Sequence, residues 1–391
     1  MLGRCDLETL RRRKSHKWRA HPADVLPAFV AEMDFDLAEP IVEAVRDALA
    51  VGDCGYGHQG DLGEAFAAFA EKRLRWSPDP AGVFAIPDVM TGVAEVIQAV
   101  TPPGAGIVIN PPVYQPFFYR LRLAGRRVVE APLRRFGDGR YDLDFEALDR
   151  ALAGDGVHVY LLCSPHNPVG RVWLRQQLLT AADVCQRHGT LLLIDEIHAP
   201  LVLPGAEQVP FLSLDHEMTQ RSVAFTSASK AWNIPGLKCG VAVVGSPELG
   251  AILEERWEAL LPGQPGVPAT VAAFERSLPW LDALLAQLDE NRALLARLLG
   301  ERLPGVAYVP PEASFLAWLD CRALGLGEDP AAEFLARGRV ALSPGPGFGT
   351  QGRGFARLNM GTSPELMAEA VRRMAAAAPP GEAESATGSS P

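Results

Sequence analysis

The sequence lacks the features of several large classes of protein. No apolar run approaches the roughly 18 residues that a membrane-spanning helix requires. Its six cysteines include no C-x-x-C pair, which excludes the common zinc and dithiol motifs. Positive charge is in deficit, because 37 lysines and arginines face 47 aspartates and glutamates and leave a net charge of −10. An acidic chain repels nucleic-acid phosphates overall, so nucleic acid is not expected as a partner.

The beginning of the chain also lacks the pattern of a signal peptide. Charged residues occur throughout positions 1–13, where a signal peptide needs an apolar stretch. We therefore expect a cytoplasmic protein with reduced, mostly buried cysteines, no membrane association and no metal site. The one basic cluster, residues 11–14 followed by Lys17 and Arg19, is interpreted as a solvated face.

The composition is that of a soluble globular protein, with 48% hydrophobic and 21% charged residues in a chain of 391. Short apolar runs alternate with helical patterns such as residues 63–76 and 175–188. The runs predicted as strands are residues 107–109, 128–129, 157–162, 191–194, 222–225 and 241–244. Strands that are apolar throughout are typical of a mostly parallel sheet covered by helices on both faces, so we predict an α/β fold.

The last third of the chain changes in character. Leucines recur at helical spacing over residues 281–299, which predicts a long amphipathic helix. Ser363 and Pro364 mark the N-cap and first residue of a closing helix. Few strand patterns separate these helices, so we expect a smaller, helix-rich α+β domain. The small, polar residues 379–391 predict a disordered tail.

The most informative motif surrounds Lys230. Residues 226–238 follow a predicted strand, which places Lys230 at the carboxyl end of that strand, where open α/β sheets bind ligands. A lone lysine there is usually a surface residue. Ser227 and Ser229 beside it, with Lys238 further on, instead favour a carbonyl cofactor that carries a phosphate. Lysine forms a Schiff base with such a carbonyl, while the hydroxyl and the second cation hold the phosphate.

A second motif, residues 191–198, delivers a carboxylate at the end of an apolar strand. Burying Asp195 there is costly unless it meets a positive partner, and a protonated pyridine nitrogen is one such partner. The alternative is that Asp195 only caps the helix that follows. Asp195, Glu196 and His198 also suit a metal ion, but no further His or Cys cluster supports that interpretation.

Two proline-stiffened loops carry further candidates. Residues 164–170 form a rigid turn after a strand, which aims Asn167 toward the same cleft. Residues 110–117 present Tyr114, which either stacks on a flat ring or packs as an ordinary aromatic.

Two other patterns are less specific. Gly92 lies where a helical pattern opens after the strand-like residues 84–89, and a glycine there offers backbone N–H groups to a phosphate. Arg357, in a strand-like segment, suits bidentate binding of a carboxylate. The glycines of residues 345–349 lack the helix that follows in a dinucleotide-binding motif, which excludes NAD, and no P-loop occurs.

The order of these residues along the chain is more specific than any one of them. From about residue 24 to residue 374 the sequence resembles the fold-type I pyridoxal 5′-phosphate (PLP) enzymes of the aspartate aminotransferase superfamily, class I/II. The residues that carry this resemblance are Tyr114, Asn167, Asp195, Lys230 and Arg357. The similarity is closer to cystathionine β-lyases of the MalY/PatB type, through residues 24–27, 31–35, 165–168, 170–173, 195–198 and 227–233. Three residues depart from those usual at their positions, namely Glu32, Trp232 and Lys238, and residues 54–58 match the usual Gly-Tyr segment only loosely.

The resemblance implies a role for each candidate. Lys230 holds the cofactor and acts as the base, Asp195 keeps the ring nitrogen protonated, and Tyr114 stacks on the ring. Asn167 and His198 bond the phenolic oxygen of the ring. The residues implied to hold the phosphate are Gly92, Val93, Ser227, Lys238 and, across a homodimer with shared active sites, Tyr56. The residues implied to bind the substrate are Arg357, Asn167 and Tyr56.

The resemblance also implies a division of the chain and an activity. Residues 1–48 form an N-terminal segment joining the small domain, residues 49–274 the large PLP-binding domain, and residues 275–378 the small domain. The expected activity is that of a carbon–sulfur β-lyase acting on cystathionine or another S-substituted L-cysteine. The alternatives are an aminotransferase, a tailoring enzyme of secondary metabolism that acts on a bulky cysteine S-conjugate, and a regulatory binding protein without turnover. The intact Lys230, Asp195 and Arg357 argue against the last of these.

Overall fold

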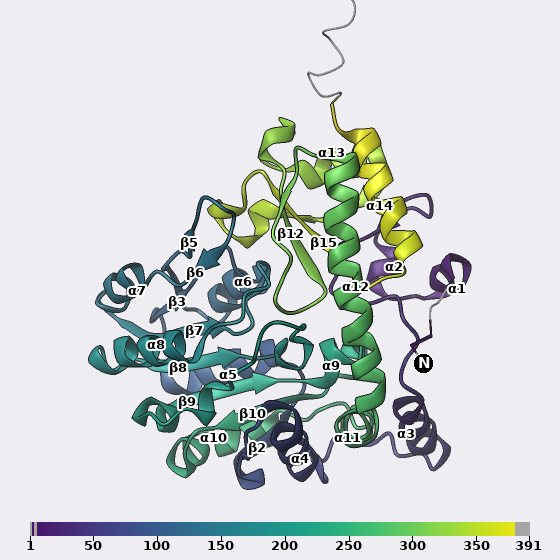
Figure 1. The fold of residues 1–391 in the computed structure, drawn as a ribbon. Coiled ribbons are helices and arrows are strands. Elements are labelled where there is room, and N and C mark those ends of the chain that lie inside the picture. Colours follow the sequence, from purple (N-terminus) through teal and green to yellow (C-terminus); the bar gives the residue numbers. More distant parts are fainter. Residues whose placement is uncertain (1, 4–5, 380–391) are drawn as a thin grey trace, which may run out of the picture.

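The larger part of the protein is built on a seven-stranded sheet in the order β2-β10-β9-β8-β7-β3-β4 (Figure 1). The computed structural model describes residues 2–3 and 6–379. The strands of this sheet are β2 (Val83–Ile86), β3 (Gly106–Ile109), β4 (Arg127–Glu130), β7 (Val157–Cys163), β8 (Leu191–Asp195), β9 (Ser222–Thr226) and β10 (Gly240–Val244). Neighbours from β9 to β4 are parallel, and β10 is antiparallel to both of its neighbours. The predicted mostly parallel sheet is confirmed, and six predicted strands fall within observed ones.

Helices cover both faces of this sheet, because successive side chains of a strand point to opposite sides. Leu161 and Leu193 belong to one core with α5, α6 and α10, whereas Leu162 and Ile194 belong to another with α8. The covering helices are α5 (Val89–Val100), α6 (Gln115–Leu123), α7 (Phe145–Leu152), α8 (Arg175–Arg187) and α10 (Pro247–Ala259). The strand-like residues 84–89 were predicted too long: β2 ends at Ile86, and the Asp88 side chain caps α5 by accepting from the Thr91 N–H.

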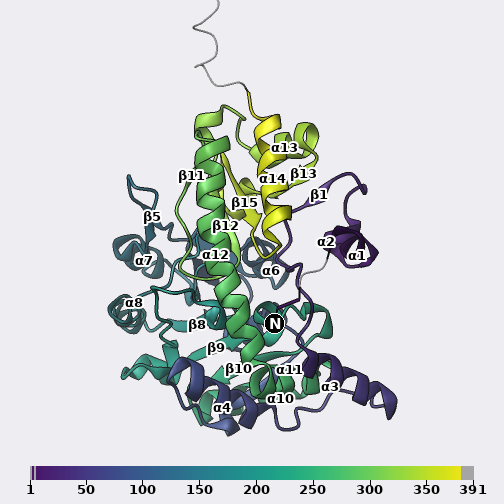
Figure 2. The same ribbon diagram turned by 45° about the vertical axis from the view of Figure 1, so that its right-hand side comes forward.

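The long helix α12 runs from the large sheet to the smaller part of the molecule (Figures 1 and 2). At its lower end it follows α11, which packs against α3 and α4. The bounds are α3 (Glu39–Ala50), α4 (Leu62–Leu74), α9 (Ala228–Ala231), α11 (Gly266–Arg276) and α12 (Leu278–Arg302). The predicted helices over residues 63–76 and 281–299 correspond to α4 and α12, with ends that differ by up to three residues.

The smaller part carries a four-stranded antiparallel sheet in the order β11-β12-β15-β14. Its elements are β11 (Ala307–Tyr308), β12 (Leu316–Asp320), β14 (Ser343–Pro344), β15 (Phe355–Asn359), α13 (Pro330–Gly338) and α14 (Pro364–Ala377). The predicted start of α14 is confirmed, because the Ser363 hydroxyl accepts from the Leu366 N–H at 3.3 Å. The expectation that few strands separate these helices is wrong, since three of the four strands were not predicted. Most of the predicted tail, residues 380–391, lies outside the described residues.

The part of the N-terminal segment that precedes α3 lies against this smaller part (Figures 1 and 2). Strand β1 (Leu26–Pro27) pairs in parallel with β13 (Val340–Ala341), and helices α1 (Leu7–Arg12) and α2 (His16–Arg19) precede it. The predicted solvated basic face is wrong at one position. Lys17 is buried, with only 1% of its surface exposed.

A hairpin of β5 (Arg134–Arg135) and β6 (Tyr141–Asp142) extends from the larger part. Among the described residues, no helix is both long enough and apolar enough to cross a membrane. The five cysteines in the described chain are free, and all are buried except Cys54.

Candidate active site

A cavity of about 230 Å³ lies at the carboxyl ends of β7, β8 and β9. Because parallel strands end at the same edge of a sheet, the loops after these strands converge there. The structure brings seven of the predicted site residues into the wall of this cavity: Tyr114, Asn167, Asp195, His198, Ser227, Lys230 and Lys238. A larger cavity of about 430 Å³, between the β5–β6 hairpin and the smaller sheet, is lined by none of them.

Lys230 follows β9 and is held by the N-terminal segment. Its Nζ donates to the Ala31 carbonyl at 3.2 Å. Burial and, to a smaller extent, the nearby Arg357 guanidinium lower the pKa of Lys230 to about 8, against the opposing effects of Asp195 and Glu32. A lysine with this pKa is partly in the amine form near neutral pH, as a nucleophile or base requires.

Asp195 ends β8 as a fully buried carboxyl group. Its Oδ1 accepts from the Ile197 N–H at 3.1 Å, so it does cap the turn that follows. Burial raises the pKa of Asp195 to about 6, against the lowering effects of that hydrogen bond and of Lys230. Asp195 makes no ion pair with any residue described in the structure. A buried carboxylate that lacks a cation fits a protonated ring nitrogen, and the cap does not exclude this role.

His198 lies one turn beyond Asp195 and is also buried. Its Nδ1 has no hydrogen-bond partner among the described residues. Burial lowers the pKa of His198 to about 3, helped by the positive charges of Lys230 and Arg357. The imidazole is therefore neutral, and its unpaired nitrogen suits a hydrogen bond to a ligand oxygen.

Arg357 is buried on β15 and faces the same region. Its Nη1 donates to Asn167 Oδ1 at 3.0 Å, and its Nη2 donates to Ser343 Oγ at 3.1 Å. The guanidinium lies over the Phe348 ring at 4.9 Å. Burial lowers the pKa of Arg357 to about 10. No carboxylate of the described chain pairs with it, and its Nε has no partner, so the group can receive an anion.

The opposite end of the cavity holds the residues expected to bind a phosphate. The Ser227 hydroxyl donates to the Cys239 carbonyl at 2.7 Å and accepts from the Ser229 N–H. Lys238 Nζ pairs with Asp88 Oδ2 at 3.0 Å. A phosphate would therefore compete with Asp88 for this cation.

Gly92 does not offer the free N–H that was expected of it. Its N–H donates to the Asp88 carbonyl within the first turns of α5, and Val93 is fully buried. A Cβ at Gly92 would lie 2.6 Å from Ile86 Cδ1, so glycine is required here for close packing of helix on strand. The residues of α5 that line the cavity are instead Val89 and Met90.

Tyr114 and Tyr56 are placed very differently. Tyr114 lines the cavity, and burial raises its pKa to about 12. Tyr56 is 91% exposed and does not line the cavity of its own chain. Its backbone forms an isolated β-bridge with Gly263.

Several neighbours of the site were not singled out from the sequence. Tyr119 and Arg120 line the cavity from α6, and their spacing from the cavity residue Pro116 places all three on one helix face. That spacing was a usable signal once Tyr114 had been chosen. Asn233 and Asn359 bind the N-terminal segment close to Lys230 and Arg357, but no local pattern marks such long-range contacts.

The free hydrogen-bonding groups fit PLP. A cation-free Asp195 suits the ring nitrogen, the unpaired His198 nitrogen suits the phenolic oxygen, and the partly neutral Lys230 suits the carbonyl carbon.

Comparisons with known proteins agree with this geometry. Residues 30–374 match the family described as aminotransferase class I and II. A relative from Mycobacterium tuberculosis, named provisionally as a cystathionine beta-lyase, is 44% identical over 95% of this chain and 97% of its own. Cystathionine beta-lyase PatB of Bacillus subtilis is 36% identical over 90% of this chain and 92% of its own. The crystal structure of cystalysin from Treponema denticola, which contains PLP, has a TM-score of 0.89 and 26% identity, and the match covers 94% of this chain and 96% of that chain.

Proposed function

Since this chain belongs to the class I and II aminotransferase family, we propose that it is a PLP-dependent carbon–sulfur β-lyase. It cleaves cystathionine, or another S-substituted L-cysteine, and consumes one water to release a thiol, pyruvate and ammonia. The observation that carries this proposal is that Lys230 and the buried Asp195 line one cavity, in a chain whose relatives bear the name cystathionine beta-lyase.

When bound, PLP supplies an electron sink for the electron pair left at the substrate α-carbon. Lys230 would bind its carbonyl carbon until the substrate amine takes that place and frees the lysine amine, Asp195 would bond its ring nitrogen, and Tyr114 would lie on its ring face. Asn167 and His198 bond its phenolic oxygen. The groups that would hold its phosphate are Ser227, Lys238 and the first turn of α5 at Val89 and Met90.

The chain's own residues then orient the substrate and move its protons. Arg357 and Asn167, already bonded to each other, bind the α-carboxylate and so fix the α-carbon near Lys230. The Lys230 amine takes the α-proton. The bond between the β-carbon and sulfur then breaks, its electron pair leaves with the sulfur, and the thiolate is protonated on release. A lysine pKa of about 8 suits both proton uptake and proton return near neutral pH.

Arg120 favours a substrate whose sulfur substituent ends in an anion. Its side chain is half-buried in the cavity wall and forms no ion pair or hydrogen bond with any residue that the structure describes. An unpaired guanidinium attracts a carboxylate strongly. We infer that Arg120 receives the distal carboxylate of cystathionine, while Arg357 receives the α-carboxylate. Replacing Arg120 with alanine should then lower kcat/KM for cystathionine by more than about tenfold and leave kcat/KM for S-methylcysteine within about twofold, because one charged hydrogen bond contributes about 1.5–3 kcal/mol.

Assembly and localisation form a further part of the proposal. Tyr56 is almost fully exposed, and the apolar Leu49 and Val51 nearby are exposed as well. We infer a homodimer in which this surface covers the partner's cavity and Tyr56 reaches its phosphate. A cytoplasmic location and the division into residues 1–48, 49–274 and 275–378 belong to the same proposal.

A turnover assay on purified protein tests the function. Cystathionine and a panel of S-alkylcysteines are supplied while pyruvate and free thiol are measured together. Equal release of both supports β-elimination. A shift of the cofactor spectrum without pyruvate or thiol would instead indicate the aminotransferase, and turnover of only bulky conjugates would indicate the tailoring enzyme. The Lys230→Ala variant should be inactive, and Lys72→Ala, at an exposed position on α4, is the matched control.

A further inference from the structure

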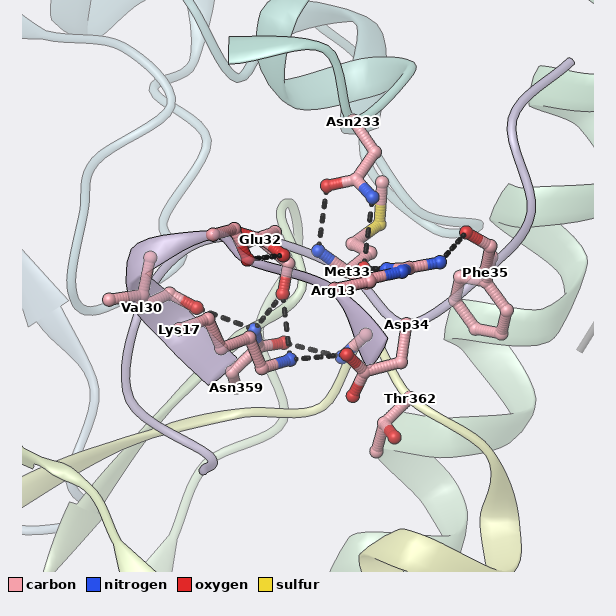
Figure 3. Close-up of polar contacts among 12 residues, drawn as sticks. Arg13, Lys17, Val30, Glu32, Met33, Asp34, Phe35, Asn233, Asn359 and Thr362 are labelled. Carbon is pink, nitrogen blue, oxygen red and sulfur yellow. Dashed lines mark hydrogen bonds and ion pairs between the residues drawn. The ribbon is translucent and has the colours of Figure 1, made fainter. Parts of the chain in front are cut away.

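We propose that a polar cluster outside the cavity sets the position of Lys230 relative to Arg357, with Lys17 as a positioning residue. This inference rests on the function proposed above, because it concerns the two groups assigned to the substrate. The cluster, called the N-terminal clasp below, surrounds residues 30–35 (Figure 3). Its side chains are those of Arg13, Lys17, Asp34, Asn233 and Asn359.

One side of the clasp fixes this segment to the loop that carries Lys230. Asn233, three residues after Lys230, binds the backbone of Met33 twice. Its Oδ1 accepts from the Met33 N–H at 2.8 Å, and its Nδ2 donates to the Met33 carbonyl at 2.9 Å. Asn233 adopts a left-handed conformation with φ of 60°, which asparagine tolerates better than most residues.

The other side fixes the same segment to the strand that carries Arg357. Asn359 is two residues after Arg357 on β15. Its Nδ2 donates to the carbonyls of Val30 and Glu32, each at 2.7 Å. Figure 3 shows the two asparagines approaching the segment from different elements. Residues 30–33 therefore tie the lysine loop to the arginine strand.

The segment also touches both functional groups directly. Lys230 Nζ donates to the Ala31 carbonyl at 3.2 Å, and Arg357 Nη2 donates to the Phe29 carbonyl at 3.3 Å. These two carbonyls are only two residues apart. Any displacement of the segment therefore moves the contacts of both Lys230 and Arg357.

Lys17 connects the clasp to the N-terminal helices. Its Nζ donates to the Glu32 carbonyl and to Asp34 Oδ1, each at 2.8 Å. Lys17 and Asp34 are both buried, so water does not replace either contact easily. Since the Glu32 carbonyl directly follows Ala31 along the backbone, the Lys17 contact restrains the acceptor of the Lys230 hydrogen bond. Arg13 adds donors to the carbonyls of Met33 and Phe35.

The test replaces the clasp contact without leaving a buried charge. The double variant Lys17→Met/Asp34→Asn removes the ammonium and leaves both buried side chains uncharged. The matched control is Lys14→Met, at an exposed position three residues before Lys17. Two readouts are measured. One is steady-state kinetics with cystathionine, from which the changes in KM and in kcat are obtained separately. The other is the pH profile for reductive methylation of Lys230 in cofactor-free protein, followed by mass spectrometry.

The charged and titratable groups that face Lys230 are Asp195, His198, Arg357 and Glu32, and none of them is changed in these variants. We expect the double variant to raise KM at least fivefold and to lower kcat by a smaller factor. The methylation midpoint of Lys230 should move down in pH, because a displaced Ala31 carbonyl no longer stabilises the ammonium form. The control should stay within twofold in both kinetic constants.

A second variant keeps the test decisive if the double variant does not fold. Asn359→Ala removes both donors to the 30–32 carbonyls and leaves the Lys17–Asp34 pair intact, so it should shift KM and the methylation midpoint in the same directions. If the folded variants lose thermal stability but keep the KM and the lysine profile of the control, the clasp is only structural and the inference is overturned. The methylation profile is read on cofactor-free protein, so it distinguishes this result from failure of the proposed β-lyase activity.

Discussion

Replacing Glu196 with glutamine is expected to stabilise the cofactor-free protein above neutral pH. Glu196 is buried, and its Oε1 accepts from the Phe211 N–H at 2.8 Å. Burial and, to a smaller extent, the neighbouring Asp195 carboxylate raise the pKa of Glu196 from an ordinary 4.5 to about 8, against the lowering effect of the Phe211 hydrogen bond. Glutamine keeps the oxygen that accepts from Phe211 but carries no charge at any pH.

The sign and size of the effect follow from proton linkage. Between about pH 4.5 and pH 8 the folded protein retains a proton that the unfolded chain releases, so its stability falls as pH rises. At 1.36 kcal/mol for each pKa unit, the free energy of unfolding lost through Glu196 reaches about 3 kcal/mol at pH 7 and about 5 kcal/mol well above pH 8. Below pH 4.5 both states are protonated, and the loss vanishes. Asp195 likewise lowers the free energy of unfolding as pH rises toward its pKa of about 6. This second decline remains in the Glu196→Gln variant.

Urea unfolding of cofactor-free protein between pH 4.5 and pH 9 measures this effect. Protein concentration is held constant, because dimerisation would otherwise shift the transition. Glu255→Gln, at an exposed position on α10, controls for the loss of one surface charge. The reasoning is refuted if Glu196→Gln and the native protein lose stability in parallel from pH 5 to pH 8, since Glu196 would then be ionised at little cost.

Two further substitutions test the site and the core. Trp232→Phe should lower the free energy of unfolding by about 2 kcal/mol and change kcat less than twofold. The reason is that Trp232 is buried against Phe69 and Phe274, and its indole N–H donates to the Ser277 carbonyl. Urea unfolding measures the first effect and steady-state kinetics the second. Arg357→Lys should raise KM at least tenfold and change the free energy of unfolding by no more than about 1 kcal/mol, since lysine keeps the charge but loses the bidentate geometry. An equal rise in KM for substrates that lack an α-carboxylate would contradict this assignment.

The sequence was sufficient for the parts of the molecule that depend on local pattern. Apolar β-branched runs between helices predicted the parallel sheet, and strand ends predicted where Asp195 and Lys230 would meet. Three strands of the smaller sheet were missed, and two of them, β11 and β14, are only two residues long, which is too short for a period-two pattern to stand out. Gly92 was misjudged for a related reason. A glycine required by helix–strand packing and a glycine at a free helix start look alike in the sequence.

Lys17 shows the limit of such reasoning most clearly. A basic run predicts a solvated face, because a buried ammonium is costly unless specific partners receive it. Those partners, the Glu32 carbonyl and Asp34, are separated from Lys17 by up to 17 residues and meet it only through the tertiary fold. Long-range polar contacts of this kind carry no periodicity, so a sequence pattern cannot reveal them.

The charges around the cavity explain why the fold tolerates so much buried polarity. The half-buried Lys230 and the buried Arg357 are cations that form no ion pair with a carboxylate of the described chain, and Asp195 is a buried acid that forms no ion pair with a cation there. Each departs from its ordinary pKa in the direction that reduces its charge, which marks the site as electrostatically incomplete. A cationic ring nitrogen and two anionic groups, a phosphate and a substrate carboxylate, would supply the missing partners. Ligand binding should therefore raise the unfolding temperature. At a free ligand concentration of a hundred times Kd, the free energy of unfolding rises by about 2.7 kcal/mol. An unfolding temperature that does not respond to PLP would contradict this assignment of the cavity, whatever the protein's activity.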